Sequence, residues 1–478
     1  MSETFKLLVP GAQSAGEIDV LSPYDLSKIA SIETGDEAAV EIALATADAL
    51  NRNRDGWKTH AERIGILERA ADIMTRRAEE LAVEAAREGG KPLLDSRVEV
   101  ARAIDGVKNC VEVLRTEPGY VVPMNINAAS MNRIGFTSKE PIGVVVAVSA
   151  FNHPLNLIVH QVCPAVATGC PVVVKPSSET SLSCMRFIQI LHEAGLEPEW
   201  AQAIVTASRN AATQLVADRR VDFFSFIGSA EVGWTLRSKL SPGARCALEH
   251  GGVAPVIVAR DAILEKAVPP LVKGGFYHAG QVCVSVQRVF AHESIARELA
   301  ERMAAEASKL TVGDPTSADT DIGPLIRPRE VDRVEEWVNE AVAGGAEVLC
   351  GGKRISDTCY ACTMLWDPRA DAKVSTREVF GPVVCVYPYS DMDEAIARAN
   401  ALTVSFQAAV FTEDLDTMLR CYKRLNGSAV MVNDHTAFRV DWMPFAGLKE
   451  SGHGVGGIPH TMHEMQVDKL LMIKSDQL

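Results

Sequence analysis

Two side chains capable of covalent and acid–base chemistry lie in glycine-containing segments of the chain. Cys283 ends the segment YHAGQVC at 277–283, and Glu249 begins the segment EHGG at 249–252. A thiol beside a glycine turn can be approached closely by a substrate and can attack a carbonyl carbon. A carboxylate near it could activate the water that frees the bound product. The two residues together predict a two-step covalent reaction.

Neither side chain is diagnostic by itself. Cys283 is one of 11 cysteines, and an unpaired cysteine is most often a small, buried and inert side chain. A buried glutamate is rare and is usually paired with a cation. The covalent hypothesis therefore depends on the motifs that accompany both residues along the chain.

Length and composition indicate an ordinary globular protein with several domains. The chain has 478 residues, 47% of them hydrophobic and 23% charged, and domains of ~100 to 200 residues would divide it into about two to four units. The 48 basic and 62 acidic residues give a net charge of −14 without a basic cluster, so we expect no nucleic acid partner. Residues 1–20 contain no apolar core of signal-peptide length, and the longest apolar run, at 142–151, is too short to span a membrane, so we expect neither export nor membrane insertion.

The cysteines indicate a reducing compartment. They are scattered along the chain and lack the regular spacing of a disulfide framework, which predicts a cytoplasmic protein. The only CxxC pair, Cys359 and Cys362, has no second pair to complete a zinc site, and we assign it a structural role. We therefore expect no metal site.

Apolar spacing predicts alternating helices and strands. From residue 60 to 88 the apolar positions step by three and four, the pattern of one helix face, and a glycine pair ends it. After Pro141 we expect strands at 143–148, 171–174, 221–227 and 254–258, and helices at 181–194 and 211–217. The alternation resumes from 270 to 427. It predicts mostly parallel sheets covered on both faces, with a boundary between two α/β domains at the glycine-rich segment 250–252.

Two further segments have the pattern of exposed strands. Polar and apolar residues alternate over 127–139 and again over 466–474. We expect the first to form a hairpin strand and the second an edge strand. Exposed strand edges are often covered by another subunit, so these segments suggest a contact between copies of the chain.

Eight short motifs, taken in order, indicate a family. They are PIGVV at 141–145, FNHP at 151–154, VKP at 174–176, FIGS at 226–229, EHGG at 249–252, GQVC at 280–283, EVFGP at 378–382 and PFAG at 444–447. In this order and with these gaps they resemble the aldehyde dehydrogenase superfamily over nearly the whole chain. The segment 277–283 is most similar to the branch that contains lactaldehyde, succinate-semialdehyde and phosphonoacetaldehyde dehydrogenases.

The resemblance implies an α/β fold with a division into domains. The expected parts are a Rossmann-like cofactor domain at 1–120 and 141–250, an α/β catalytic domain at 251–430, a β flap for oligomerisation at 121–140 and 460–478, and a substrate-site loop at 431–459 that returns to the cofactor domain. A homodimer or homotetramer follows from the same resemblance.

Within the resemblance, three residues match the catalytic positions of the family. Cys283 matches the nucleophile, which would form a thiohemiacetal with the aldehyde and, after hydride loss, a thioester. The Asn152 side-chain amide and the Cys283 backbone N–H would hold the oxyanion, each such donor being worth about 3 kcal/mol. Glu249 matches the carboxylate that activates water for thioester hydrolysis. Relatives that transfer the acyl group to coenzyme A generally lack this glutamate, so Glu249 favours release of a free carboxylic acid.

Other positions match the binding site for a nicotinamide cofactor. Gly228 and Ser229 lie where a strand meets a helix whose N-terminal N–H groups can face pyrophosphate. The remaining matches are Lys175 for the adenosine ribose, Glu378 for the nicotinamide ribose, and Phe380 packed nearby.

One departure bears on the choice of cofactor. Many relatives that prefer NAD have a glutamate three residues after the lysine, where this chain has Ser178. The change removes a carboxylate that would repel a 2′-phosphate. Glu179, one position further along, could replace part of it, so NAD and NADP both remain possible cofactors.

The substrate positions point to a polar or anionic aldehyde. The resemblance places four side chains near the substrate: His153, His160, Arg439 and Phe445. Histidine and arginine would suit a small polar or anionic aldehyde, although either histidine could instead be structural. Members of this branch that bind phosphate or phosphonate tend to have arginine immediately before the nucleophile, and this chain has Val282, which argues against a phosphorylated substrate.

The sequence thus predicts NAD(P)-dependent oxidation of a small aldehyde to the free acid. Two alternatives stay open. One is a coenzyme A-acylating dehydrogenase, whose product would be an acyl-CoA. The other is a member of the family retained as a binding or structural protein, although catalysis alone requires Cys283, Glu249, Asn152 and Lys175 together.

Overall fold

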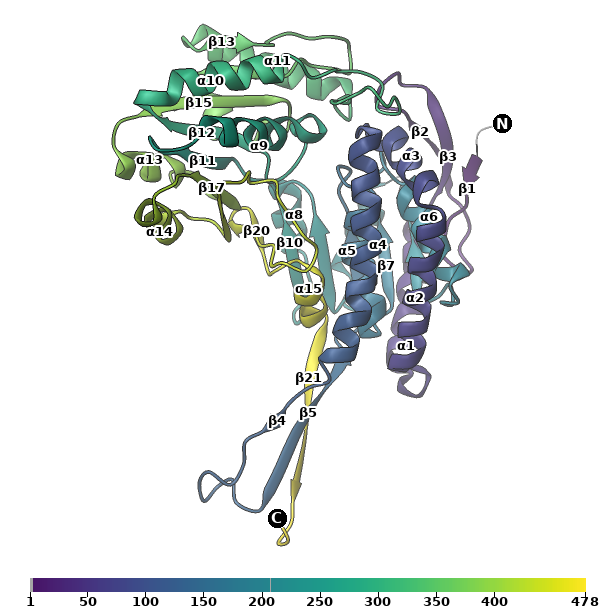
Figure 1. Ribbon diagram of the computed structural model, residues 1–478. Coiled ribbons are helices and arrows are strands. Elements are labelled where there is room, and N and C mark those ends of the chain that lie inside the picture. The colour runs from purple at the N-terminus through teal and green to yellow at the C-terminus, as the bar shows by residue number, and fades with distance from the viewer. Residues whose placement is uncertain (1–2, 207) are drawn as a thin grey trace.

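The computed structural model describes residues 3–206 and 208–478, and two largely parallel sheets dominate it (Figure 1). The first sheet has six strands in the order β20-β10-β9-β6-β7-β8. They are β6 Val145–Val148, β7 Val172–Lys175, β8 Ala201–Ala203, β9 Phe223–Ile227, β10 Arg245–Glu249 and β20 Gly452–His453. All neighbours pair in parallel except β20, which is antiparallel to β10.

Helices cover both faces of the first sheet because its strands are apolar on both sides. Val145 and Ala147 pack into one core, whereas Val144 and Val146 pack into a second core on the opposite face. The first core includes α2 His60–Arg76, α3 Ala78–Gly89, α4 Leu93–Thr116, α5 Asn156–Thr168, α6 Leu182–Glu193 and α15 Ile458–Glu464. The second includes α1 Glu37–Arg52, α7 Arg209–Ala217 and α8 Ala230–Arg237.

The second sheet has seven strands in the order β13-β14-β15-β12-β11-β17-β18. They are β11 Ala254–Val258, β12 Val286–His292, β13 Glu347–Cys350, β14 Thr363–Trp366, β15 Val383–Tyr389, β17 Gln407–Phe411 and β18 Ala429–Val432. Only β13 pairs antiparallel. The accompanying helices are α9 Leu264–Phe276, α10 Glu293–Ala307, α11 Pro328–Ala343, α12 Lys373–Thr376, α13 Met392–Ala399 and α14 Leu415–Arg424. The chain passes from one sheet to the other between β10 and β11.

Smaller sheets complete the fold. The antiparallel sheet β21-β5-β4 projects from the body and carries the C-terminal end (Figure 1); its strands are β4 Val121–Val122, β5 Arg133–Pro141 and β21 Gln466–Lys474. At the other end of the sequence, β1 Glu3–Phe5, β2 Gly16–Leu21 and β3 Lys28–Thr34 form a three-stranded sheet. The short strands β16 Val404–Ser405 and β19 Leu448–Lys449 pair with each other, and two 3-10 turns occur, η1 Arg54–Gly56 and η2 Tyr277–Gly280.

The predicted single helix over 60–88 is wrong, because the structure divides it into α2 and α3. Arg77 lies at the junction with φ −105° and ψ 15°, outside the helical region, although its N–H still bonds to Ile73 and Met74. The apolar spacing continues through the break, so the sequence pattern did not reveal it. Within the described ranges, no helix combines the length and the apolarity needed to cross a membrane.

Glu88 joins two helices through a buried carboxylate. Its oxygens accept hydrogen bonds from the Leu182 N–H at 2.7 Å and the Ser183 N–H at 2.8 Å, and also from the Ser183 hydroxyl. These groups begin α6, whose N-cap residue makes no side-chain cap of its own. Glu88 at the end of α3 therefore supplies the cap.

Replacing Glu88 with alanine should destabilise the protein by about 3 kcal/mol, because buried N–H groups at the start of α6 lose their acceptor. Thermal or urea unfolding measures the change. Glu79→Ala is the matched control on α3: it removes an exposed pair with Arg97 and should leave the midpoint nearly unchanged. Equal midpoints for the two variants would contradict the capping role of Glu88.

Candidate active site

A cavity of about 800 Å³ lies between the two main sheets. Its wall includes residues from the carboxyl ends of β6, β9 and β10 and from the segment that precedes β12. Ligands of open parallel sheets bind at such carboxyl ends. Cys283, Glu249 and Asn152 all line this cavity, so the fold brings the three predicted catalytic positions to one wall.

The turn before Cys283 has an unusual backbone conformation. His278 and Ala279 have φ values of 49° and 54°, and Gly280 has a φ of 72°. A methyl group on Gly280 would overlap the Gly381 carbonyl oxygen, so both its conformation and its close approach require glycine. The sequence segment is thereby folded into a tight turn that presents the thiol to the cavity.

Gln281 holds this turn in place. Its side-chain nitrogen donates to the carbonyls of His278 at 3.3 Å and Pro324 at 3.2 Å. Its side-chain oxygen accepts from the Ile326 N–H at 3.0 Å. A buried amide with these partners fixes the backbone immediately before the thiol. In the sequence, Gln281 was notable only as part of the GQVC motif, and no pattern indicated the hydrogen bonds that it makes.

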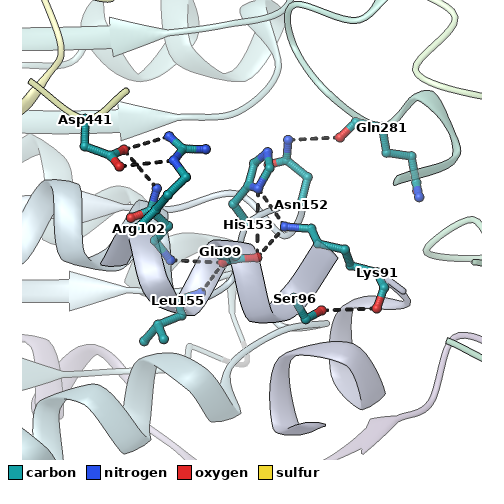
Figure 2. A network of polar contacts seen from close by, with 10 residues as sticks. Lys91, Ser96, Glu99, Arg102, Asn152, His153, Leu155, Gln281 and Asp441 are labelled. Atoms are coloured by element: carbon teal, nitrogen blue, oxygen red, sulfur yellow. Dashed lines mark hydrogen bonds and ion pairs between the residues drawn. The ribbon is translucent and has the colours of Figure 1, made fainter. Parts of the chain in front are cut away.

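Two N–H groups beside the thiol are available to an oxygen atom. The Asn152 amide donates one hydrogen bond to the Gln281 carbonyl at 3.0 Å (Figure 2), and a primary amide carries a second N–H. Within the described part of the chain, the Cys283 N–H donates to no backbone carbonyl of another residue. Asn152 is only 5% exposed, so this amide is held in a largely dry setting.

Burial disfavours the ionised forms of the Cys283 thiol and the Glu249 carboxyl group. It raises the pKa of the Cys283 thiol to about 12, and it raises the pKa of Glu249 above its usual range. The Arg439 guanidinium opposes both shifts. Its Nη1 lies 3.9 Å from Glu249 Oε2, and its central carbon lies 3.6 Å from the centroid of the Phe445 ring. Arg439 is thus the cation that acts on the thiol and the carboxylate together.

A network of polar side chains contacts Arg439 and includes His160, which lies outside the cavity. Its Nη2 lies 3.4 Å from His160 Nδ1, and the other nitrogen of that ring lies 2.7 Å from Asp441. Asp441 also accepts two hydrogen bonds from Arg102, at 2.7 and 3.1 Å (Figure 2). Arg102 and Arg439 line the cavity, whereas His160 does not. His160 therefore contacts Arg439 from outside the cavity, and burial lowers its pKa to about 4.

The predicted cofactor positions are divided between the cavity wall and its surroundings. Gly228, Ser229, Glu378 and Phe380 line the cavity, whereas Lys175 and Ser178 do not, although Ser177 between them does. The Lys175 ammonium donates to the Pro176 carbonyl at 3.3 Å. Of the four predicted substrate residues, three are on the wall, namely His153, Arg439 and Phe445, and His160 is not.

Glu378 lies against the glycine-rich segment that follows Glu249. It accepts a hydrogen bond from the Gly252 N–H at 3.2 Å. A side chain on Gly251 would overlap the Glu378 carboxylate and displace it from its present position. Burial raises the pKa of Glu378 to about 8.

His250 has a role that the motif comparison did not reveal. The imidazole Nδ1 lies 3.0 Å from the Gly228 carbonyl oxygen. The Gly228 N–H in turn donates to the Glu249 carbonyl at 3.0 Å. Gly228 therefore contacts Glu249 through its N–H and His250 through its carbonyl oxygen, and these two contacts hold the strand-to-helix turn in place.

Comparison with known proteins is consistent with this geometry. The model of the aldehyde dehydrogenase family matches residues 9–471. The 3-sulfolactaldehyde dehydrogenase of Priestia aryabhattai is 37% identical over 461 residues, which cover 96% of this chain and 95% of that protein. Aldehyde dehydrogenase 21 of Physcomitrella patens, solved with the reaction product succinate, has a TM-score of 0.94 and 33% identity over 99% of both chains. Glyceraldehyde-3-phosphate dehydrogenase of Methanocaldococcus jannaschii, solved with NADP, has a TM-score of 0.91 and 34% identity over 97% of this chain and 100% of that one.

The chain therefore belongs to the aldehyde dehydrogenase family. It is an NAD(P)-dependent oxidoreductase of that family, and the predicted α/β fold is confirmed.

Proposed function

We propose that the protein oxidises a small polar or anionic aldehyde to the free carboxylic acid through a covalent intermediate on Cys283. The observation that carries the proposal is that Cys283, Glu249 and Arg439 line one cavity. They supply a nucleophile, a base for water and a cation for the substrate.

The proposed reaction has two covalent stages. The Cys283 thiol gives its proton to solvent water and its sulfur bonds to the aldehyde carbon. The resulting oxyanion accepts hydrogen bonds from Asn152 and the Cys283 N–H. Loss of hydride from that carbon leaves a thioester. Water then attacks the thioester while Glu249 takes its proton, and the thiolate departs as the carboxylic acid forms.

NAD or NADP, when bound, supplies the hydride acceptor. We assign the pyrophosphate to Gly228 and Ser229, because the Ser229 side chain makes no capping bond and leaves the first N–H groups of α8 available. Glu378 and Phe380 would hold the nicotinamide ribose. Lys175 and Ser178 would meet the adenosine ribose beyond the main cavity.

The residues proposed to lie near the adenosine ribose favour neither NAD nor NADP strongly. Ser178 has no carboxylate to repel a 2′-phosphate. Glu179, which could replace one, is paired with Arg327 at 2.7 Å. Its charge is therefore partly neutralised, which supports acceptance of NADP as well as NAD.

Arg439 supports a substrate with an anionic or hydroxyl group. It faces the cavity, whereas Arg102 is already paired with Asp441. The names of the relatives described above include a sulfonate, a dicarboxylate product and a phosphate. Because Val282 replaces the arginine of phosphate-binding relatives, we favour hydroxy-, carboxy- or sulfo-aldehydes over phosphorylated ones.

Reduction of NAD and of NADP, followed at 340 nm across an aldehyde panel, tests the function. The panel contains propanal, benzaldehyde, lactaldehyde, glycolaldehyde, succinate semialdehyde and phosphonoacetaldehyde, first without and then with coenzyme A. We expect turnover without coenzyme A, greatest for a hydroxy- or anionic aldehyde. Turnover only with coenzyme A would contradict the role of Glu249. No reduction of NAD or NADP under any of these conditions would count against an enzyme for this substrate class.

Replacing Arg439 with leucine should lower kcat/KM for succinate semialdehyde by about 10- to 100-fold, the worth of one charge-assisted hydrogen bond. The same change should affect a neutral aldehyde of similar length much less. The ratio of the two values is the measurement, because loss of Arg439 also raises the pKa of Cys283 and slows both substrates.

Arg333→Leu is the matched control for Arg439. Arg333 lines the same cavity but hydrogen-bonds to Glu330 at 2.9 Å. The Arg333 variant should leave the ratio of kcat/KM for the anionic aldehyde to that for the neutral aldehyde unchanged. An unchanged ratio in the Arg439 variant would remove Arg439 from the substrate site.

We also propose that the protein is a cytoplasmic homodimer or homotetramer. All the cysteines are free thiols, which suits a reducing compartment. The strand β21 is an edge of the projecting sheet and exposes Leu470, Leu471, Met472 and Ile473 by 39% to 51%. Such an apolar edge favours cover by a second copy. Light scattering and small-angle scattering would measure the number of subunits.

The division into domains stays a prediction. The passage between the sheets at 250–253 and the projecting β21-β5-β4 sheet support the proposed cofactor domain, catalytic domain and flap. The strand β18 crosses the proposed boundary at residue 430, so we extend the catalytic domain to 432.

A further inference from the structure

A fully buried lysine contacts the wall of the cavity. Lys91 follows the glycine pair at the end of α3 and has a side-chain exposure of 0%. Its ammonium pairs with the Glu99 carboxylate and lies 2.6 Å from His153 Nδ1 (Figure 2). None of the proposed covalent steps uses this lysine.

We propose that Lys91 is a positioning residue that fixes His153 as a hydrogen-bond donor toward the substrate. The inference rests on the proposed function and adds a specificity device to it. The donor would select aldehydes that carry an acceptor oxygen near the carbonyl, such as 2-hydroxyaldehydes, over alkyl aldehydes of equal length.

The choice of tautomer follows from the chemistry of the two groups. A lysine ammonium has donors and no acceptor, so His153 Nδ1 must accept the hydrogen bond. In a neutral imidazole the second nitrogen then carries the proton. Burial, with the Lys91 charge added to it, lowers the pKa of His153 well below its usual range and keeps the ring neutral. The ring therefore has its N–H at Nε2.

Glu99 keeps the lysine in place and favours its charged form. One Glu99 oxygen accepts from the N–H groups of Leu155 at 2.9 Å and Asn156 at 3.0 Å, at the start of α5. The other oxygen pairs with Lys91. Burial lowers the pKa of Lys91, and Glu99 is the main group that opposes this shift. Both partners are almost completely buried, so the pair is protected from competing water.

The Nε2 edge of His153 is open to the cavity. In the described part of the chain this nitrogen has no hydrogen-bond partner, and it is not among the atoms sealed from solvent. His153 lines the cavity and directly follows Asn152. Figure 2 shows the ring beside the Lys91 ammonium, with its second nitrogen directed away from the lysine. Tyr277 stacks on the ring with a centroid distance of 6.1 Å and an interplanar angle of 27°.

A purely structural ion pair would not need the histidine contact. Burying two charges costs desolvation free energy, and such pairs are often no more stabilising than apolar side chains of similar size. A structural role also predicts that loss of the pair slows every substrate equally. The positioning role predicts a change in the preference between substrates.

The test compares lactaldehyde with propanal, which differ by one hydroxyl group. The double variant Lys91→Met, Glu99→Gln removes both charges, while the amide oxygen of the introduced glutamine can still accept from the start of α5. We expect the ratio of kcat/KM for lactaldehyde to that for propanal to fall by about tenfold, the worth of one neutral hydrogen bond. An unchanged ratio in the folded variant would overturn the proposal.

Two substitutions of His153 test the same donor without disturbing the ion pair. His153→Gln can place an amide N–H near the Nε2 position, whereas His153→Asn places one only near Nδ1. The glutamine variant should keep more of the preference for lactaldehyde than the asparagine variant. Equal ratios in the two would overturn the proposal even if the double variant fails to fold. If the wild-type protein oxidises no aldehyde of the panel, the proposed function itself is contradicted. That result differs from an unchanged substrate preference in the variants, which would contradict only the role of Lys91 and His153.

Discussion

Replacement of Cys283 by alanine should reduce aldehyde oxidation by at least about a thousandfold, because removal of a nucleophile eliminates the covalent path. Binding of NAD or NADP should remain close to that of the wild type, since the proposed cofactor contacts lie at Gly228, Ser229 and Glu378. Steady-state rates at 340 nm and cofactor titration measure the two properties separately. Turnover retained in this variant would contradict the assignment of Cys283.

Cys246→Ala is the matched control. Cys246 is a half-buried thiol on β10, outside the cavity, and its loss should leave turnover unchanged. Alkylation provides a second measurement. Because the pKa of Cys283 is raised to about 12, the thiol is protonated at neutral pH. Its reaction with iodoacetamide should therefore accelerate as pH rises, by up to about tenfold per unit.

The parallel sheets were the most predictable part of the fold. The run expected at 254–258 is β11 itself, and the strands β6, β7 and β9 lie within two residues of the expected limits. Their near-continuous apolar residues are typical of strands buried on both faces. The strands β1 to β3 were not predicted. Most residues of β1 and β2 are exposed, and β3, although largely buried, lacks a continuous apolar run. In the segment 127–139 the strand begins only at Arg133.

The sequence could indicate which residues to examine but not the groups that support them. The predicted residues Cys283, Glu249 and Asn152 stand in short motifs, so their types and order were visible. The contact between Arg102 and Asp441 joins residues 339 positions apart, and that between Lys91 and His153 spans 62 positions. Contacts of this kind depend on how α3, α4 and the loop after β18 pack. No local spacing encodes them.

Replacement of Glu249 by glutamine should separate the two covalent stages. The amide cannot take a proton from water, so steady-state turnover should fall by about 100- to 10,000-fold. Attack by Cys283 and the first hydride transfer do not require the carboxylate. Rapid mixing should therefore show a burst of reduced cofactor approaching one equivalent per active site, followed by almost no further reaction.

The covalent product of that burst identifies the step that is blocked. A thioester on Cys283 should be trapped by hydroxylamine and should appear in intact-protein mass spectra as the mass of the acyl group. Glu450→Gln, which changes an exposed carboxylate that accepts from Thr403, should show no trapped thioester. A Glu249 variant without a burst would mean that this carboxylate acts before hydride transfer. In that case Glu249, 3.9 Å from Arg439, would have to assist deprotonation of the thiol rather than hydrolysis of the thioester.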